Sequence, residues 1–528
     1  MKKILLSLCI TICSFSIAQQ FNQISDINPG NLSSYPTNFT ELNNNLIFTA
    51  TSSSSFYPRD IYKSDGTASG TSLVMAISPY LSSGNEPVFM KCGNSLYFKI
   101  MDASSGYLDK LWKTDGTPGG TGLVKDFSTK EFCSNLCEMN GLMYFMTSYF
   151  DIVWGNTIHE LWKSDGTLSG TMVVKDWTNS SFGNSITIRA FNNKIYFLGN
   201  ESDGTLAGTI QTGVLLPLIS GSCILNGIIY YRGSDGKLWK TDGTLIGTVQ
   251  AVDFPVYNNL YTSNGWIYFS GGYNGVGLPG IELCKTDGTL ANTSMIKDIY
   301  FGFNSSNPSN ILDINGTIFF LANDGINGKE LWKTDGTAGG TTLVKDISPG
   351  LGGIYEYQST KHDNQLYFTT FYYSSNANGA TLNGGVWKSD GTELNTVLVQ
   401  SISDSIGEIL EINCNLFLAA DNLDLPYPDN FNSELWCDTS NCSSLDLVSL
   451  NELKQTQIYP NPTTSKITIT TALDKIGYTY TILDNIGKSV YTSKVESLET
   501  VIDLQDLLPG LYFFKLENTR EILKIIKQ

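Results

Sequence analysis

The chain has 528 residues and a formal net charge of −17, with 33 lysines and arginines against 50 aspartates and glutamates. Such acidity disfavours nucleic acid and anionic membranes as partners. The only two histidines, His159 and His362, argue against histidine-based metal sites and most histidine-dependent catalysis. Abundant Gly, Ser, Thr and Asn, with 27 Tyr and 26 Phe, are typical of many short strands joined by turns.

The first 18 residues have the pattern of a secretory signal peptide. Lys2 and Lys3 precede an apolar run that ends in the small residues Ser16-Ile17-Ala18, which predicts cleavage after Ala18. A membrane anchor is the alternative, but the apolar run is too short to favour it, and no later run is long enough to span a bilayer.

A short motif, Lys-Ser/Thr-Asp-Gly-Thr, recurs about every 50 residues. Its aspartates are Asp65, Asp115, Asp165, Asp242, Asp287, Asp335 and Asp390. One longer gap holds a degenerate copy, ESDGTLAGT at 201–209, and a last copy, ELWCDTSNC at 434–442, has lost the Gly. A period of this length indicates a solenoid, a propeller or an array.

Each copy is preceded by a turn and an apolar run, as in NGTIFFLA at 315–322. One unit therefore contains four predicted strands, here 311–314, 317–322, 330–334 and 342–347, which is the pattern of a β-propeller blade. Leu331 and Trp332 should point to opposite faces of the sheet, each covered by a neighbouring blade. Nine turn-and-strand pairs occur, but the fourth unit, Ile188–Leu215, lacks the ELWK strand, so we predict eight or nine blades.

The two ends of the repeat region complement each other. The segment QISDINPG at 23–30 resembles the fourth strand and exit of a unit, LVKDISPG at 343–350, and the last unit has no convincing fourth strand. We therefore predict that the N-terminal strand completes the last blade, which removes exposed sheet edges. The predicted propeller covers residues 19–440.

These repeats resemble the ELWxxDGT repeat family found in secreted proteins of Bacteroidetes. The cores ELWKSDGTLSGT at 160–171 and ELWKTDGTAGGT at 330–341 match the family pattern most clearly. Departures include Ile61-Tyr62 for Leu-Trp and Cys284 for Trp. The resemblance implies export but brings little known activity.

After a connector at 441–457, alternating apolar strands at 458–528 predict a small Ig-like β-sandwich. The segments YPNP and LPGLYFFKL look like the type A sorting domain of the type IX secretion system. The motif residues are Tyr459, Pro460, Asn461, Pro462, Gly510 and Tyr512. This resemblance implies that the secretion machinery is a partner, that the tail is removed, and that the protein is released or attached to the cell surface. An ordinary C-terminal binding module is the alternative.

The repeated Asp-Gly-Thr turn has a structural and a ligand-binding interpretation. Its Asp and Thr can bond the turn backbone while Gly adopts an unusual φ. A single Asp per loop falls short of a calcium loop, so calcium stays a candidate and we predict no other metal or cofactor. Because a catalytic centre needs different residues at one point, a residue repeated around a ring is predicted to be structural.

Function is predicted to lie in loops that do not repeat. In a propeller, the A–B and C–D connections share one face, and the variable B–C and D–A connections share the other. Aromatic side chains in the variable loops are the candidate ligand contacts: Trp154, Tyr273, Tyr372, Tyr373 and Tyr427. They suit recognition of sugars or proteins, although ordinary loops contain the same residue types.

Eight cysteines follow the predicted signal peptide, and secretion permits disulfides. Cys133 with Cys137, and Cys437 with Cys442, are close enough in sequence to pair. The remaining four fall in strand-like segments and are interpreted as buried small hydrophobic residues. They are Cys92, Cys223, Cys284 and Cys414.

Three functions remain open from the sequence. The first is a secreted or surface-displayed propeller that binds a glycan or a protein and catalyses nothing. The second is a propeller glycosidase or lyase, since carboxylates are plentiful. The third is a structural part of a surface layer or adhesin. No catalytic residue is predicted, because no nucleophile elbow, P-loop, HExxH or dinucleotide motif occurs in the sequence.

Overall fold

The computed structural model describes most of the chain as strands. The described residues are 21–29, 32–52, 59–77, 87–102, 108–127, 129–132, 134–153, 155–177, 186–214, 221–272, 279–354, 356–376, 379–402, 406–420, 433–438, 457–459, 463–470, 478–485, 487–495, 499–505, 507–516 and 522–528. They divide into two compact units, 1–440 and 441–528. Within them, no helical segment has the length and apolar character needed to cross a bilayer.

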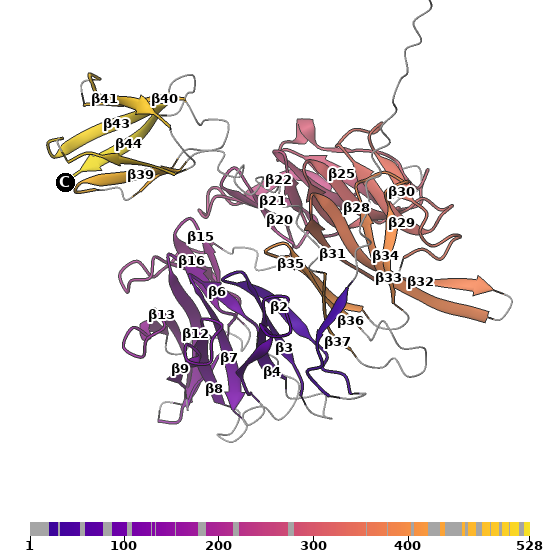
Figure 1. Cartoon of the computed structure of the whole chain (residues 1–528), viewed down its shortest axis with the longest axis horizontal. Coiled ribbons are helices and arrows are strands. Elements are labelled where there is room, and N and C mark those ends of the chain that lie inside the picture. Colours follow the sequence, from indigo (N-terminus) through magenta and orange to yellow (C-terminus); the bar gives the residue numbers. More distant parts are fainter. Residues whose placement is uncertain are drawn as a thin grey trace, which may run out of the picture. The chain divides into compact units, whose positions relative to one another are not determined.

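The first unit contains nine antiparallel sheets across its described residues, which we number as blades in chain order (Figure 1). Blade 1 contains β2 (Thr37–Leu42), β3 (Asn45–Ala50), β4 (Asp60–Ser64) and β5 (Ser72–Met75), and blade 2 contains β6 (Met90–Cys92), β7 (Ser95–Asp102), β8 (Leu108–Thr114) and β9 (Gly122–Asp126). Blade 3 contains β11 (Cys137–Met139), β12 (Leu142–Asp151), β13 (Asn156–Ser164) and β14 (Met172–Trp177), with β10 (Glu131–Phe132) added beside β12. Blade 4 contains β15 (Arg189–Phe191), β16 (Lys194–Phe197), β17 (Asn200–Ser202) and β18 (Ile210–Gln211), and blade 5 contains β19 (Cys223–Leu225), β20 (Ile228–Arg232), β21 (Lys237–Thr241) and β22 (Val249–Pro255). Blade 6 contains β23 (Tyr261–Ser263), β24 (Trp266–Gly271), β25 (Glu282–Thr286) and β26 (Ser294–Met295), with a 3₁₀ turn at Leu290–Asn292. Blade 7 contains β27 (Ser309–Ile314), β28 (Thr317–Asn323), β29 (Lys329–Thr334) and β30 (Thr342–Lys345), and blade 8 contains β31 (Glu356–His362), β32 (Gln365–Asn376), β33 (Gly379–Ser389) and β34 (Val397–Ile402). Blade 9 contains β35 (Ile406–Ile412), β36 (Asn415–Ala420), β37 (Glu434–Asp438) and β1 (Asn22–Ser25).

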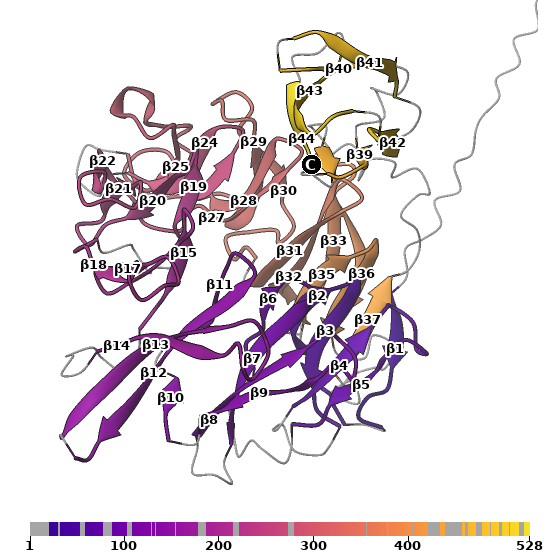
Figure 2. The same ribbon diagram turned by 90° about the vertical axis from the view of Figure 1, so that its left-hand side faces the viewer.

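The N-terminal strand closes the last blade, as predicted. β1 pairs with β37, with Gln23 opposite Trp436, and Figure 2 shows indigo β1 beside orange β37. A hydrophobic cluster that includes Ile24 and Phe48 joins blade 9 to blade 1. Each of the other neighbouring pairs of blades shares a cluster as well. The ring is therefore a closed β-propeller with nine blades, and the thin fourth unit forms a blade of its own.

Each blade exposes one apolar face to each neighbour, because adjacent strand residues point to opposite sides of a sheet. Leu331 belongs to the cluster between blades 7 and 8, whereas Trp332 belongs to the cluster between blades 6 and 7. The sequence prediction for these two residues is confirmed. The tight turns before the second strands use left-handed residues, as at Asn315 (φ 53°) and Gly316 (φ 88°), which matches hairpin twist.

The Asp-Gly-Thr turn holds the C–D hairpin together and docks it on the preceding blade. Asp335 Oδ1 accepts hydrogen bonds from the backbone N–H (2.8 Å) and Oγ1 (2.7 Å) of Thr337, and the other complete copies repeat this pattern. The turn glycine lies against a tyrosine hydroxyl of the preceding blade. Such pairs are Gly166 with Tyr97, Gly204 with Tyr144, Gly243 with Tyr196, Gly288 with Tyr230, and Gly336 with Tyr268.

A buried glutamate at the start of the third strand fastens the D–A connection. In blade 7, Glu330 is fully buried and accepts hydrogen bonds from the backbone N–H groups of Ile347 (2.9 Å) and Ser348 (3.0 Å). Burial raises the pKa of Glu330 to about 8, with smaller contributions from Asp346 and Asp324, against the opposing backbone hydrogen bonds. The neutral acid is thus favoured in the folded protein.

Glu330 should make the propeller less stable as the pH rises. Its pKa is about 8 when folded but near 4.5 when unfolded, so between these values the folded state binds more protons. The free energy of unfolding should fall by up to about 1.4 kcal/mol per pH unit from this group. Urea unfolding at pH 5.5 and pH 8 measures this loss. The free energy of unfolding should fall less between the two pH values for Glu330→Gln than for wild type. For Glu131→Gln, at an exposed position, it should fall as much as for wild type. Parallel profiles for Glu330→Gln and wild type would refute this role.

The second unit forms two antiparallel sheets around one core. One sheet contains β38 (Gln457–Tyr459), β39 (Lys466–Thr470) and β42 (Glu499–Asp503); the other contains β41 (Ser489–Lys494), β40 (Thr479–Leu483), β43 (Gly510–Leu516) and β44 (Ile522–Lys527). Ile467 from the first sheet and Phe514 from the second belong to the same buried cluster. This arrangement agrees with the predicted small β-sandwich.

Of the described motif residues of the tail, two lie at strand ends and Tyr512 lies within β43. Tyr459 ends β38 and Gly510 begins β43, while Pro460, Asn461 and Pro462 lie outside the described residues. The hydroxyl of Tyr512 donates to Leu508 O (2.8 Å), which fastens the turn before β43 to the strand itself.

Both predicted disulfides are wrong. Cys137 and Cys437 are free and buried, whereas Cys133 and Cys442 lie outside the described residues. Cys137 packs in the cluster between blades 3 and 4, and Cys437 in the one between blades 9 and 1. Burial raises the pKa of Cys137 to about 11 and that of Cys437 to about 12, so both thiols stay protonated.

Cys414 corrects a further sequence interpretation, because it is disulfide-bonded rather than a buried free thiol. It occupies the second position of the β35–β36 turn, where most blades have Gly or Asn, and its φ is 67°. The remaining predicted buried cysteines, Cys92, Cys223 and Cys284, are buried and free.

Candidate functional site

The two faces of the propeller follow from contacts between blades. Asn415 Nδ2 in the A–B turn region of blade 9 donates to Asp65 O (2.9 Å), and Asn192 Nδ2 of blade 4 donates to Asp242 O (3.4 Å). The A–B turns and the Asp-Gly-Thr turns therefore share one face. The D–A and B–C connections leave the strands at their opposite ends and form the other face.

The predicted aromatic contacts are not brought together by the described residues. Tyr372 and Tyr373 are consecutive residues of β32 and pair with Asn383 and Leu382 of β33, in the long hairpin visible in Figure 1. The other three candidates, Trp154, Tyr273 and Tyr427, lie outside the described residues. The five residues stay predictions.

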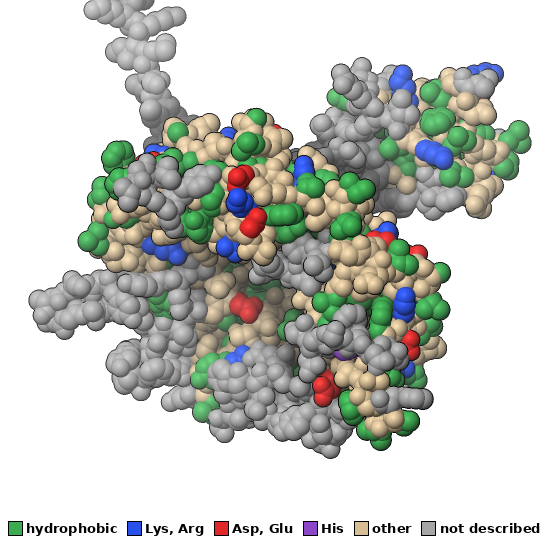
Figure 3. All heavy atoms as spheres, turned by 180° about the vertical axis from the view of Figure 1, so that it is seen from behind, with side chains coloured by type: hydrophobic (Ala, Val, Ile, Leu, Met, Phe, Trp, Pro, Cys, Tyr) green, Lys and Arg blue, Asp and Glu red, His purple; other side chains and the backbone are tan. Residues whose placement is uncertain are grey.

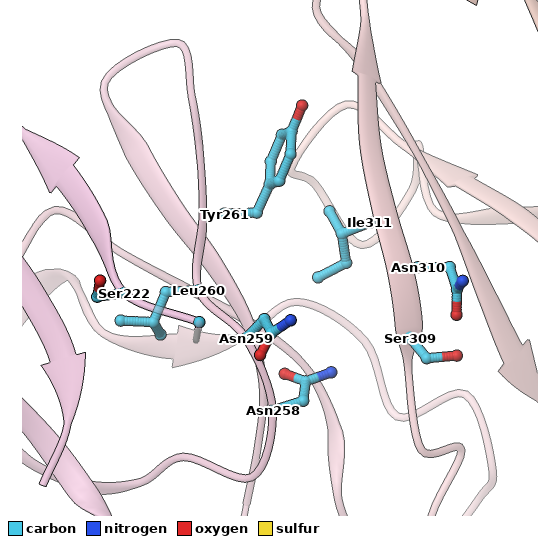
Figure 4. Close-up of a pocket in the computed structure, with 9 residues that line it drawn as sticks. Ser222, Asn258, Asn259, Leu260, Tyr261, Ser309, Asn310 and Ile311 are labelled. Carbon is cyan, nitrogen blue, oxygen red and sulfur yellow. The ribbon is translucent and has the colours of Figure 1, made fainter. Parts of the chain in front are cut away.

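A pocket of about 540 Å³ lies on the variable face where blades 5, 6 and 7 meet. Its walls come from the ends of three successive D–A connections and the first residues of the inner strands that follow them. The lining residues are Gly221, Ser222, Asn258, Asn259, Leu260, Tyr261, Ser309, Asn310 and Ile311 (Figure 4). A smaller pocket of about 180 Å³ shares four of them and adds Tyr231, Arg232 and Tyr257.

Hydrogen bonds between blades fix the shape of the larger pocket. Asn258 Oδ1 accepts from Ser270 N (2.7 Å), and its Nδ2 donates to Pro308 O (2.6 Å), so this side chain fastens blade 6 to blade 7. The hydroxyl of Tyr261 accepts from Asp313 N (3.2 Å). Leu260 N donates to Gly221 O (2.9 Å), which joins blades 5 and 6. The pocket is thus preformed by the ring itself.

The lining combines amides, hydroxyls and short apolar groups. No carboxylate lines either of the two connected pockets in the described structure, and the one cation is Arg232, whose Nε donates to Val256 O (2.6 Å). Ser309 Oγ is buried and has no hydrogen-bond partner within the described residues.

The pocket lies on the face that the sequence analysis favoured, but its lining residues were not among those predicted. The prediction favoured aromatic side chains in the long B–C loops, whereas the pocket is built by shorter D–A connections. A usable signal was present, because small polar residues lie at or just before the start of the inner strand in three successive units: Gly221-Ser222, Asn258-Asn259 and Ser309-Asn310.

Metal binding and glycoside hydrolysis would each need side chains of other types than those that line this pocket. In the described part of the chain, no group of three or more His, Cys, Asp or Glu side chains is arranged to hold a metal ion. A glycosidase centre needs two carboxyl groups flanking the bond that breaks. The chemistry that the lining offers is hydrogen bonding and apolar contact.

The comparisons with known proteins give their clearest result for the C-terminal tail. Residues 457–528 match the family model of the secretion system C-terminal sorting domain. A search of curated proteins found no match for the chain.

Several solved structures are similar to this chain at low identity. BamB from Moraxella catarrhalis is 10% identical, with a TM-score of 0.34, over 66% of this chain and 95% of that one. The β-propeller domain of the Trilobed protease from Pyrococcus furiosus is 10% identical, with a TM-score of 0.30, over 69% and 95%. The computationally designed Ika8 protein is 11% identical, with a TM-score of 0.34, over 78% and 98%. The sheet topology and the matched tail together identify a β-propeller protein that the type IX secretion system exports to the cell surface or the medium.

Proposed function

We propose that the propeller is a non-catalytic binding protein whose ligand is a neutral glycan, held in the pocket between blades 5, 6 and 7. The neutral, preformed lining of this pocket carries the proposal. We also infer membership of the ELWxxDGT repeat family for residues 19–440, a signal peptide at 1–18 and a linker at 441–457.

The chemistry of the pocket suits a sugar. The amide of Asn259 at the pocket wall has both a donor and an acceptor, and a serine hydroxyl does as well, which matches the paired capacity of sugar hydroxyls. Leu260, Tyr261 and Ile311 supply apolar surface for the C–H faces of a ring. The volume falls in the range of small-ligand sites. Because the lining contains no carboxylate pair, it favours binding over glycosidase chemistry.

On the face shown in Figure 3, the charged side chains of the described residues are scattered among uncharged atoms. The chain as a whole is acidic, so its overall field would not itself select a neutral ligand. Selectivity would then depend on hydrogen bonds and shape inside the pocket.

A glycan array with the labelled full chain tests the function. Saturable binding to a set of related neutral glycans, competed by the free sugar, is the expected result. A blank array together with a proteome pull-down that recovers no partner would overturn the binding function and favour a structural role. Release of reducing ends from the bound glycan would favour the enzyme.

Filling the pocket should abolish binding without unfolding the ring. Asn259 is exposed at the pocket wall, so Asn259→Trp should reduce glycan affinity at least about tenfold, which corresponds to about 1.4 kcal/mol. Gln250→Trp, at an exposed position on the outer strand β22 of blade 5, is the matched control and should bind normally. Calorimetry gives both affinities, and equal affinity for the two variants would remove this pocket from the proposal.

A further inference from the structure

Lysines of the third strand dock on the turn of the next blade. Lys163 Nζ in blade 3 donates to Gly204 O of the blade 4 turn at 2.9 Å. Lysines at the equivalent position lie against the turn glycine of the next blade in three further interfaces: Lys113 at Gly166, Lys285 at Gly336 and Lys333 at Gly391. In three of these four interfaces an ammonium nitrogen lies at the turn glycine, whereas at Gly391 the near atom is Lys333 Cδ. The three contacts define a position that an ammonium group can occupy.

Lysines of the outer strand make a second, parallel contact. Lys175 Nζ in blade 3 donates to Thr209 O (2.7 Å), and Lys297 Nζ in blade 6 donates to Thr341 O (2.7 Å). Each accepting carbonyl belongs to the threonine that ends the Asp-Gly-Thr loop of the next blade. Two ammonium groups therefore brace the loop of the next blade where both lysines are present.

Blade 4 has lost both lysines. Sequence alignment of ESDGT with WKSDGT puts Glu201 at the third-strand lysine position and Asn200 at the tryptophan position. When residues are counted from the threonine that ends the Asp-Gly-Thr loop, Gly213 stands where other blades have the lysine of the outer strand. Glu201 instead accepts a hydrogen bond from Lys194 Nζ (2.5 Å) within its own blade.

A pocket of about 340 Å³ occupies this interface between blades 4 and 5. Its lining residues are Asn192, Lys194, Tyr196, Glu201, Thr212, Val214, Asp242, Gly243, Thr244 and Leu245. The interface between blades 9 and 1 also lacks the lysine, but there Cys437 Sγ and Asn415 Nδ2 lie against Gly66 and fill the position. The pocket is thus specific to blade 4 and does not follow from every loss of this lysine.

The charge of the lining favours a cation. Glu201 and Asp242 contribute two carboxylates against the single ammonium of Lys194. Hydrogen bonds from Thr244 lower the pKa of Asp242, with no lysine contribution, whereas Lys113 adds to the lowering that Thr167 produces at Asp165. Asp242 is therefore ionised at neutral pH. Because Glu201 is paired with Lys194, one incoming positive charge would balance the pocket.

We propose that the pocket between blades 4 and 5 binds a primary alkylammonium group, which takes the place of the missing third-strand lysine. The ammonium would donate to Gly243 O, as Lys163 does to Gly204 O, and to the carboxylate of Glu201. The alkyl stem would lie along Val214 and Leu245. The group could belong to a free amine or to a lysine side chain of another protein.

Calorimetry of the full chain with three probes tests the site and distinguishes the two sources. The probes are n-butylammonium, a lysine blocked as its Nα-acetyl methylamide, and the same compound acetylated at Nε. We expect saturable binding of a charged probe and none of the Nε-acetylated one. Tighter binding of blocked lysine identifies a protein-borne lysine, and tighter binding of butylammonium identifies a free amine. Equal binding of the neutral probe would overturn the proposal.

Two variants separate this site from general attraction of cations to an acidic protein. Glu201→Lys restores the lysine of the other blades and should lower affinity for the charged probe at least tenfold. Glu131→Lys makes the same charge change at an exposed position and should lower it less than twofold. Equal losses for both variants would show nonspecific ionic attraction and reject the site.

A third variant keeps the test valid if Glu201→Lys fails to fold. Lys163→Ala should open the matching position between blades 3 and 4, so that added butylammonium raises the melting temperature of this variant more than that of wild type. No difference in the shift would contradict the assignment of the position to an ammonium group.

Discussion

Gly288→Ala should lower the free energy of unfolding of the propeller by about 3 kcal/mol or more. The backbone at Gly288 has a φ of 92°, and an added Cβ would come within 2.2 Å of the Tyr230 hydroxyl. A left-handed conformation costs a non-glycine residue about 1–2 kcal/mol, and overpacking adds about 1–3 kcal/mol. Urea unfolding followed by tryptophan fluorescence measures the loss.

Two other glycines separate the contributions to this effect. Gly265 has a φ of 79° but nothing within 4 Å of an added Cβ, so Gly265→Ala should show the backbone cost alone. Gly119 is exposed and has neither feature, so Gly119→Ala should change stability by less than about 0.5 kcal/mol. If Gly288→Ala is no worse than Gly265→Ala, the contact with the preceding blade does not limit stability.

Ile24→Asp should destabilise the ring by about 4 kcal/mol, because it removes a buried apolar side chain and introduces an unpaired charge. Ile24 is 7% exposed and lies in the cluster that joins blade 9 to blade 1. Chemical denaturation should also become less cooperative, since the two ends of the ring would separate before the other interfaces.

Ile210→Asp is the matched control for the closing strand. Ile210 lies on β18, which is also the outermost strand of its blade, but it is 48% exposed. Its replacement should cost less than about 1 kcal/mol. Similar denaturation midpoints for the two variants would show that the N-terminal strand adds little to stability.

The features that repeat could be predicted from the sequence, because repetition averages over the details of any one blade. The four-strand unit, the opposite faces of Leu331 and Trp332, and the closing strand at Asn22–Ser25 all follow from the period and from alternation along strands. The number of blades was ambiguous because blade 4 lacks the tryptophan motif. Three-residue and two-residue strands at β17 and β18 still complete that sheet.

The features that do not repeat were harder to predict. Cys437 and Cys442 are neighbours in sequence, but the direction of a side chain on a strand depends on which blade it faces, and Cys437 faces blade 1. The pocket of blades 5 to 7 joins residues from three units, such as Ser222, Asn259 and Ser309. Their proximity depends on ring geometry, which local spacing does not contain.

The closing strand has a consequence for folding kinetics. Ile27 N donates to the carboxylate of Glu434 across 407 positions in the sequence, so the first and last parts of the propeller must meet late. Bringing such distant segments together carries a large loop-closure entropy and slows folding. Blade 9 cannot be completed until both β1 and β37 are available. A chain that lacks either end of the propeller therefore cannot close the ring.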